Sequence, residues 1–550
     1  MAQLDETLGN GQTGHLSDHD KLHKKANYVF DVTDYGAVGD GATDDTAAIQ
    51  AAIDAAEAYA NVGVVLFPPK DYALSSGLTC DASDVQFLGY GARLLPDSAF
   101  IALDITSASI VSTTLAADTR PNQEKLELTS AASISVGDLL QVRSDTLWHY
   151  DNRGTAVKGE LQRVTRIDGS DVYVEAHVHD AYDVPGETVT VTAYTPLNNM
   201  AIRGLTVLYA ANTLASGIGL DWTVRAVIED VTVENAATLG IALASCYETT
   251  INRCTIRSAN RVSLGYGIST SDTFGTLVTD CRFFNCRRGV DFSGTSPSRN
   301  DRVTGCFVSG SGLASDGTNN QLQASGMGTH GPADQTVFDN NTIINCFNGI
   351  YVRGQSTTIR DNTFSGTVDN VILMSYGLDL LVKDNVANAQ VTPNTTATFS
   401  PSIHNWKPKR FLNIQSTVDA DTQLHVEGNL CYDLRETFCR FDSATASQAT
   451  IVNNVAHLHA PSAGTATSFL KANTATTLSS SVVAGNHIVD VVGTFTNLSG
   501  VTLDSTVALV RPPTTVPDVA GARDSGEGAL ADLLTELETL GLITDSSTAS

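Results

Sequence analysis

The chain has 550 residues, with 60 acidic and 33 basic side chains and a formal net charge of −27. This charge argues against a nucleic-acid partner and against docking on an anionic membrane surface, and we expect no membrane insertion because no apolar stretch is long enough to span a bilayer. The nine cysteines form no CxxC pair and lie mostly in apolar stretches, so we expect buried thiols, with no zinc site or disulfide framework.

The first predicted segment, residues 1–27, is polar. His15, His19 and His23 would follow one another at i, i+4 and i+8 on a helix. That spacing could suit a metal, but no accompanying group of carboxylates and histidines has a known metal-binding pattern. We therefore predict a short attachment or oligomerisation helix, and we expect no metal and no cofactor.

The stretch from Tyr35 to Ala56, YGAVGDGATDDTAAIQAAIDAA, combines turn, cap and helix signals. Thr43 or Asp44 can accept backbone N–H bonds as an N-cap, and the aspartates place negative charge at the positive end of a helix. Apolar residues at i, i+3, i+4 and i+7 predict a narrow helix face made of Ile49, Ala52, Ile53 and Ala56. A short strand follows and ends at two prolines. We therefore interpret these aspartates as scaffold residues in preference to a catalytic or metal site.

YGAVGDGATDDTAAIQAAIDAA, followed by VVLFPPKDY, resembles the amino-terminal signature of the pectate-lyase-like superfamily, in the form common in bacteriophage tailspikes and minor tail proteins. The resemblance implies an all-β, single-stranded right-handed parallel β-helix that begins within residues 28–104. It also implies that the helix caps the open end of the solenoid, that the protein is part of a virion, and that three chains form a homotrimer.

Residues 105–198 have the pattern of a small antiparallel β-domain inserted into the solenoid. LELTSAASISVGDLLQVRSD, GELQRVTRIDGSDVYVEAHV and ETVTVTAY alternate apolar and polar residues with a period of two. The insert is similar to those of phage β-helix proteins, so the resemblance agrees with this interpretation.

A six-residue frame recurs from residue 202, mostly at intervals of about 21–27 residues, as expected when each unit is one coil of a solenoid. We assign residues 199–500 to the main β-helix on this pattern. The fourth position of the frame changes from aliphatic residues to thiols and then to amides: Leu205, Val231, Cys254, Cys281, Cys306, Asn341, Asn362, Asn385, Asn429, Asn454 and Asn486. We predict that these residues stack along the solenoid axis, where each buried amide hydrogen-bonds to the next coil.

Irregular stretches of a solenoid emerge as surface loops and often form its binding face. The richest group of charged residues lies in CRRGVDFSG, GMGTHGPADQ and GIYVRGQ. The last two resemble patterns of phage β-helix proteins, which makes His330 and Arg353 our first choices for a catalytic site that faces a glycan, with Asp291 as its carboxylate. The substrate-binding residues that we expect are Arg287, Asp301, Asp316, Asp334 and, in SIHNWKPKRF, Trp406. For each residue, a merely solvated or packed position is the alternative.

The carboxyl-terminal end differs from the repeats. VRPPTTVPD, within residues 501–517, predicts an extended linker. Residues 518–550 contain a leucine stripe that is too short to form a stable helix alone, so we expect it to pack on partners. Both terminal segments resemble those of phage structural proteins, which implies attachment to other virion proteins.

The resemblance leaves several functions open. One is a phage tail protein that attaches to a host-surface polysaccharide without performing chemistry. Another is a depolymerase that also cleaves this polysaccharide, either as a hydrolase with paired carboxylates or as a lyase with a cation and a general base. A purely structural head or tail fibre is the third.

Overall fold

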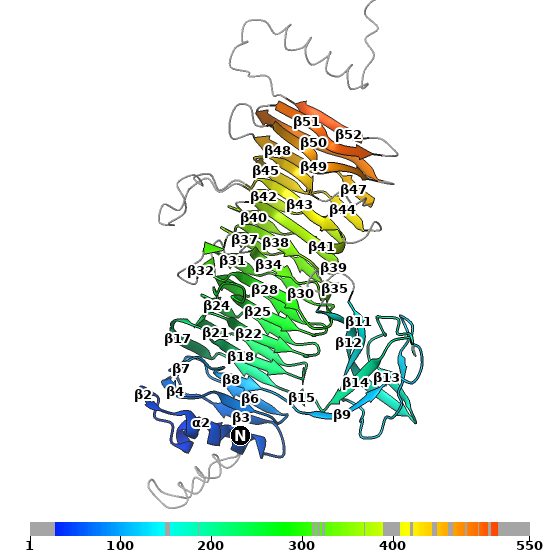
Figure 1. The fold of residues 1–550 in the computed structure, drawn as a ribbon. Helices are drawn as coiled ribbons and strands as arrows, with labels where there is room; N and C mark the ends of the chain where they lie inside the picture. The colour runs from blue at the N-terminus through cyan, green and yellow to red at the C-terminus, as the bar shows by residue number, and fades with distance from the viewer. Residues whose placement is uncertain are drawn as a thin grey trace, which may run out of the picture.

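The computed structural model describes residues 28–148, 155–184, 186–310, 314–315, 320–321, 325–367, 369–388, 408–417, 422–442, 448–459, 466–478, 481–492, 494–503 and 508–514. Within them, 42 strands form one hydrogen-bonded system in which each strand pairs with the equivalent strand of the next coil. Figure 1 shows these strands stacked as the rungs of one elongated solenoid. The terminal helices predicted within residues 1–27 and 518–550 lie outside the described residues.

Each coil contributes one strand to each of three parallel faces, which we name A, B and C in chain order. Face A contains β1 (Val29–Asp31), β3 (Gly63–Leu66), β6 (Val85–Leu88), β16 (Ala201–Arg203), β20 (Val227–Glu229), β23 (Thr250–Asn252), β26 (Leu277–Thr279), β30 (Arg302–Thr304), β36 (Val337–Asp339), β39 (Gln355–Arg360), β44 (Gln423–Glu427), β47 (Gln448–Val452) and β52 (Ala508–Thr514). Face B contains β2 (Asp40–Asp44), β4 (Asp71–Leu74), β7 (Arg93–Pro96), β17 (Thr206–Thr213), β21 (Thr232–Ala236), β24 (Thr255–Arg257), β27 (Arg282–Phe284), β31 (Phe307–Ser309), β37 (Thr342–Ile344), β40 (Thr363–Ser365), β42 (Val386–Asn388), β45 (Leu430–Leu434) and β48 (Val455–His459).

Face C is the side on which the predicted catalytic residues lie. It contains β5 (Leu78–Cys80), β8 (Leu103–Ile105), β18 (Ser216–Asp221), β22 (Leu239–Ala244), β25 (Tyr266–Ser271), β28 (Arg288–Ser293), β34 (Ser325–Thr329), β38 (Asn348–Val352), β43 (Arg410–Thr417), β46 (Thr437–Phe441), β49 (Ala466–Leu478) and β51 (Thr494–Leu503). Three strands turn a corner: β41 (Asn370–Lys383) runs from face C to face A, and both β50 (Val482–Val492) and β52 run from face A to face B. Because β51 and β52 still pair with earlier coils, the solenoid continues into the segment for which a linker was predicted.

The predicted axial column of thiols and amides is confirmed. Cys254 N donates to Cys281 Sγ at 3.4 Å, and Cys306 N donates to Asn341 Oδ1 at 2.9 Å. From Asn341 onward, each asparagine N–H donates to the side-chain oxygen of the asparagine in the next coil, at 2.9–3.0 Å. All nine cysteines are buried, as predicted. The column therefore satisfies its own polar groups inside one continuous apolar core.

Helix α2 (Thr46–Glu57) covers the first coils with its four predicted apolar residues buried. The helix packs closely on β3. A Cβ added at Gly63 would lie only 2.9 Å from the carbonyl oxygen of Ala56, so the small residues on both sides allow this close approach. The scaffold interpretation of the aspartates is also confirmed: Asp44 Oδ1 accepts a bond from Thr46 N at 3.1 Å, and Asp40 Oδ1 accepts bonds from the backbone of the following turn. Asp45 occupies the N-cap position instead of Thr43 or Asp44, and its carboxylate binds the preceding loop.

The inserted domain is a six-stranded antiparallel sheet in the order β10-β13-β12-β11-β14-β9. Its strands are β9 (Ser109–Thr114), β10 (Lys125–Glu127), β11 (Leu139–Leu147), β12 (Val157–Asp168), β13 (Asp171–Val174) and β14 (Val189–Tyr194). It has its own apolar core, and a second apolar cluster packs it on the corner between faces C and A. Figure 1 shows it beside the middle coils, with β11 and β12 nearest to them.

Several short strands lie outside the three faces. Two parallel pairs line the corner beneath the inserted domain: β15 (Leu197–Asn198) with β19 (Thr223–Val224), and β29 (Ser298–Arg299) with β35 (Ala333–Asp334). A hairpin of β32 (Ala314–Ser315) and β33 (Asn320–Gln321) lies in the glycine-rich loop. No helix among the described residues is both long and apolar enough to cross a membrane.

Candidate functional site

The three predicted catalytic residues lie on neighbouring coils of face C. Asp291, in β28, pairs across the face with Gly328 of β34. The two residues that flank Asp291 in the strand belong to the core, so strand alternation places Asp291 on the outer side. His330 directly follows β34 and Arg353 directly follows β38, which brings both residues to the same end of the face.

Asp291 is held from two sides. His330 Nδ1 lies 2.7 Å from Asp291 Oδ2, and Arg288 Nη1 donates to Asp291 Oδ1. Asp291 is fully buried and the Arg288 and His330 side chains are 1% and 10% exposed, so the contacts are shielded from water. A buried ion pair of this kind holds its members in one geometry, because losing either partner would leave an uncompensated charge.

The protonation states in this group follow from burial and charge. Burial alone would raise the pKa of Asp291, but the charges and hydrogen bonds of His330 and Arg288 lower it to about 2. When His330 is neutral, the charge of Arg288 still opposes the effect of burial on this pKa. Burial lowers the pKa of His330 more than Asp291 raises it, so the imidazole is neutral near pH 7. Because an ionised carboxylate only accepts, Nδ1 must carry the proton and Nε2 the lone pair. His330 is thus prepared to act as a general base.

Two further guanidinium groups lie beside this pair. Arg287 Nη1 donates to Tyr266 Oη at 3.1 Å, and the Arg353 guanidinium lies 4.5 Å from the centre of the Tyr351 ring. Arg288 lies between the two aromatic rings, 5.8 Å from Tyr266 and 5.3 Å from Tyr351. We call this group the His330 cluster, and it consists of Tyr266, Arg287, Arg288, Asp291, His330, Tyr351 and Arg353.

The His330 cluster has more hydrogen-bond donors than it uses. Among the described residues, Nε and Nη2 of Arg288, Nε of Arg287 and Nε of Arg353 are buried and have no hydrogen-bond partner. The cluster contains three guanidinium groups and one carboxylate, so it carries excess positive charge. Guanidinium groups bind carboxylates, sulfates and phosphates with paired, charge-assisted hydrogen bonds. The cluster is therefore suited to an anionic group on a ligand.

The other predicted binding residues lie elsewhere. Asp301 is fully buried in a turn, where Oδ1 accepts a bond from Thr276 N at 2.7 Å and Oδ2 accepts one from Thr273 Oγ1 at 3.2 Å. Burial raises its pKa to about 7, and it has no exposed surface to offer a substrate. Asp334 lies at the corner beneath the inserted domain. Asp316 and Trp406 lie outside the described residues.

Arg299 joins the inserted domain to the solenoid next to the His330 cluster. It donates to Gly159 O at 2.7 Å, to Asp180 Oδ2 at 2.8 Å and to Asp334 Oδ2 at 3.2 Å. Close by, Trp148 Nε1 donates to Gly331 O at 3.2 Å, so the domain also touches the residue that follows His330. These hydrogen bonds hold the inserted domain in place beside the His330 cluster.

Sequence reasoning missed the two tyrosines and the contribution of the inserted domain. Tyr266 is in register with Arg288, whereas Tyr351 is in register, through Gly328, with Asp291. The register with two charged residues of the site was the available signal. The contacts of Trp148 and Arg299 join residues that are more than 100 positions apart, so no local sequence pattern predicts them. Within the described residues, no group of three His, Cys, Asp or Glu side chains could hold a metal ion.

Two family models match the chain. Residues 29–125 match "Rhamnogalacturonase A/epimerase, pectate lyase-like", and residues 166–321 match "Right handed beta helix region". The chain therefore folds as a right-handed β-helix whose amino-terminal part is pectate-lyase-like. This finding confirms the fold that the amino-terminal signature implied.

Curated relatives share only parts of this β-helix chain. Mannuronan C5-epimerase AlgE3 of Azotobacter vinelandii is 62% identical over 48 residues, which are 9% of this chain and 3% of the epimerase. The capsule K1-specific depolymerase of Klebsiella phage K64-1 is 23% identical over 310 residues, which are 52% of this chain and 33% of the depolymerase. The chain thus spans a third or less of the length of these relatives.

Phage tailspikes are similar to this β-helix in structure. The Gp54 tailspike of Acinetobacter baumannii bacteriophage AP22, solved in complex with A. baumannii capsular saccharide, has a TM-score of 0.62 at 14% identity and covers 94% of this chain and 82% of its own. The tailspike gp49 of Pseudomonas phage LKA1 has a TM-score of 0.61 at 16% identity and covers 86% of this chain and 83% of its own. At these identities the likeness shows a shared fold.

Proposed function

We propose that this chain is a phage tail protein of the tailspike type that binds a polysaccharide of the host surface through the His330 cluster. The observation that carries the proposal is the set of unpartnered guanidinium donors beside a neutral imidazole on the outer side of face C. The shared fold and the capsular saccharide named with the Gp54 tailspike support the ligand class. The distant match to a capsule depolymerase points to the same kind of ligand.

The charge of the cluster favours an acidic polysaccharide. Arg287, Arg288 and Arg353 exceed the single carboxylate of Asp291 in charge. The guanidinium groups of Arg287 and Arg353, which are less completely buried than Arg288, match the oxygens of a uronate or another acidic substituent. The net charge of the whole chain is −27, but salt screens the repulsion from distant surface charges. An ion pair between a ligand carboxylate and a partly buried guanidinium group is screened much less. An acidic sugar is thus held by the cluster in spite of the chain's overall repulsion.

Cleavage by β-elimination is the second candidate function, and the protonation state of His330 favours it. In this reaction Nε2 removes the proton from the carbon next to the sugar carboxylate, a C=C bond forms, and the glycosidic C–O bond at the neighbouring carbon breaks. The leaving oxygen then takes a proton from water. A guanidinium group would stabilise the charge that develops on the carboxylate. Two-carboxylate hydrolysis fits less well, because the cluster has one carboxylate and both of its oxygens are occupied.

The test combines binding and product analysis. Purified protein is incubated with capsular polysaccharide of candidate hosts and with oligogalacturonate, and the products are examined for unsaturated ends and for saturated reducing ends. We expect Arg353→Ala to weaken binding, and His330→Ala to abolish unsaturated products while binding persists. Arg360→Ala and His487→Ala, which lie outside the cluster, serve as matched controls. Binding that survives Arg353→Ala and His330→Ala together would place the site elsewhere, and no binding at all would favour a structural fibre.

Assembly is a separate part of the proposal. We infer that residues 1–27 and 518–550 attach the chain to other virion proteins and hold three copies together, as their resemblance to phage structural segments implies. Native mass spectrometry of the full chain tests this directly. A mass of three chains supports the inference, and a monomer contradicts it.

A further inference from the structure

A second hollow region lies on face A, round one corner from the His330 cluster. It consists of three adjoining hollows with volumes of about 490, 430 and 330 Å³. His179 and Gln335 line both the first and the second, and Ser356 lines both the second and the third. The hollows therefore form one groove, whose first part lies between the inserted domain and the solenoid and whose last part lies on open strands. We call it the face A groove.

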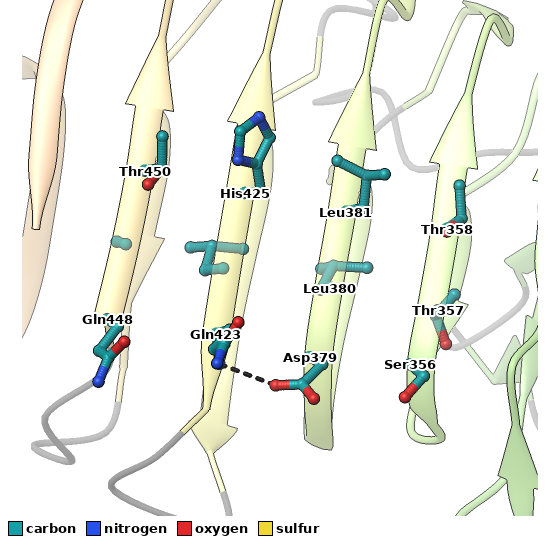
Figure 2. Close-up of a pocket in the computed structure, with 12 residues that line it drawn as sticks. Ser356, Thr357, Thr358, Asp379, Leu380, Leu381, Gln423, His425, Gln448 and Thr450 are labelled. Atoms are coloured by element: carbon teal, nitrogen blue, oxygen red, sulfur yellow. Dashed lines mark hydrogen bonds between the residues drawn. The ribbon is translucent and has the colours of Figure 1, made fainter.

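Parallel register stacks the floor of this groove along the solenoid. Asp334 pairs with Gln355 across neighbouring coils, and the stack continues through β39, β41, β44 and β47. Figure 2 shows the open end as two rows of side chains, one made of Ser356, Asp379, Gln423 and Gln448 and the other of Thr358, Leu381, His425 and Thr450. From Phe274 to Gln448 the groove crosses six coil-to-coil steps of roughly 4.8 Å, so it is roughly 29 Å long.

The middle hollow contains polar atoms that lack partners. Among the described residues, His179 Nε2, Asp334 Oδ1 and Gln355 Oε1 are buried without a hydrogen-bond partner, and all three residues line this hollow. Burial lowers the pKa of His179 to about 4, so its ring is neutral near pH 7. Buried polar atoms without partners cost stability, and their convergence in one hollow points to a ligand that supplies the missing bonds.

The charged groups of the middle hollow are already paired within the protein. Lys158 Nζ lies 2.6 Å from Glu187 Oε1, and Arg299 bonds to both Asp180 and Asp334. The oxygens of Asp334 and Gln355 that lack partners can only accept hydrogen bonds, so a ligand that binds them must carry hydrogen-bond donors. Trp148 adds an aromatic surface to the same hollow, and aromatic surfaces pack well on the apolar face of a sugar ring. Hydroxyl groups on a sugar meet all of these requirements.

We propose that the face A groove binds a neutral, hydroxyl-rich stretch of a polysaccharide. The proposal rests on the proposed function in taking a polysaccharide as the ligand, and it adds a second site that prefers neutral sugars to acidic ones. Only Gly331, Pro332 and Ala333 separate His330 from Asp334, and only Gly354 separates Arg353 from Gln355. One chain with acidic and neutral residues can therefore occupy both sites at once.

The indole N–H signal of Trp148 in ¹⁵N-labelled protein reports on this groove. The chain has three tryptophans, and single Trp→Phe variants assign their signals. The probes are methyl glucoside, methyl galactoside, methyl mannoside and N-acetylglucosamine. We expect at least one of them to shift the Trp148 signal to saturation and to leave the Trp222 signal in place. Ser356→Trp fills the groove and should weaken this binding at least tenfold. Ser365→Trp, the same change on face B of the same coil, should not.

The outcomes separate this inference from the proposed function. If none of the four sugars moves the Trp148 signal, or if both Ser→Trp variants weaken binding equally, the groove proposal is wrong. His330→Ala should keep the Trp148 response, whereas Ser356→Trp should keep the binding of oligogalacturonate. If wild-type protein binds neither oligogalacturonate nor the capsular polysaccharides while the Trp148 response is intact, the proposed function is overturned and the groove proposal stands.

Discussion

The His330 cluster and the face A groove occupy adjoining faces of the same coils, yet they are built in opposite ways. The cluster buries an ion pair and concentrates positive charge, so its members depend on one another. The groove is made of rows of side chains from stacked strands, and the charged groups of its middle hollow are paired within the protein. One solenoid can therefore present two recognition chemistries, because each outward position can vary without disturbing the core behind it.

The largest effect that we expect comes from Arg288→Ala. The variant leaves the Asp291 carboxylate buried with its main positive partner gone, so the free energy of unfolding should fall by about 3–5 kcal/mol. Chemical denaturation, followed by tryptophan fluorescence, measures this change. The control is Arg360→Ala, which removes a half-exposed partner of Asp339 and should cost less than about 1 kcal/mol.

A double variant sharpens this result. Arg288→Met combined with Asp291→Leu removes both charges, so it should recover most of the stability that Arg288→Ala loses. If the double variant is as unstable as the single one, the loss of stability came from packing. The members of the cluster would then not depend on one another through the buried ion pair.

Much of the fold could be predicted because it repeats. The column that runs from Cys254 to Asn486 can be predicted from the sequence because the same six-residue pattern recurs in each coil. The structure confirms its contacts. The predicted linker at VRPPTTVPD was wrong for residues 508–514, which form β52. Prolines disfavour a central strand, but β52 is the last strand of face A in the described chain, where an edge tolerates them.

The site could be predicted only in part. His330, Asp291 and Arg353 stand near glycines in neighbouring repeats, so the repeat frame itself brings them close. Asp301 stands in a similar polar stretch but turns into the protein, and only three-dimensional burial distinguishes the two cases. The partners of Trp148 and Arg299 belong to a domain inserted between two coils, and their pairing depends on how that domain docks.

Asp301 provides a prediction about pH that the cluster does not share. Its folded pKa of about 7 lies above the usual value, so the stability that it contributes is present at low pH and is lost as the pH rises toward 7, by at most about 1.4 kcal/mol per pH unit. Asp301→Asn keeps the acceptor for Thr276 N and removes the buried charge. We expect the variant to gain about 1–2 kcal/mol at pH 8 and to lose this part of the pH slope. Unfolding at pH 5 and pH 8 measures both effects, and an equal change at the two values would contradict the assignment.

The pH profile of cleavage tests the state of His330. Because burial lowers its pKa below 6.5, the neutral base should persist somewhat below pH 6.5. The rate should be flat around neutrality and should then fall about tenfold per pH unit on the acid side. Single-turnover rates with oligogalacturonate, at constant ionic strength, define the midpoint. A midpoint above pH 7 would mean that Asp291 dominates over burial and that His330 is charged in the resting protein.

The smallest effect that we expect distinguishes a binding groove from a packed surface. Gln355 Oε1 is buried without a partner, so the wild-type protein carries an unmet hydrogen bond there. Gln355→Leu removes that acceptor and should leave stability unchanged or raise it by up to about 1 kcal/mol, while it weakens the binding of the neutral sugar that shifts the Trp148 signal. In the cluster, by contrast, every change that weakens binding should also weaken the fold or the chemistry. If Gln355→Leu destabilises the protein, the Gln355 amide already has a hydrogen-bond partner within the protein. The groove is then a packed surface whose polar atoms stabilise the fold and bind no sugar.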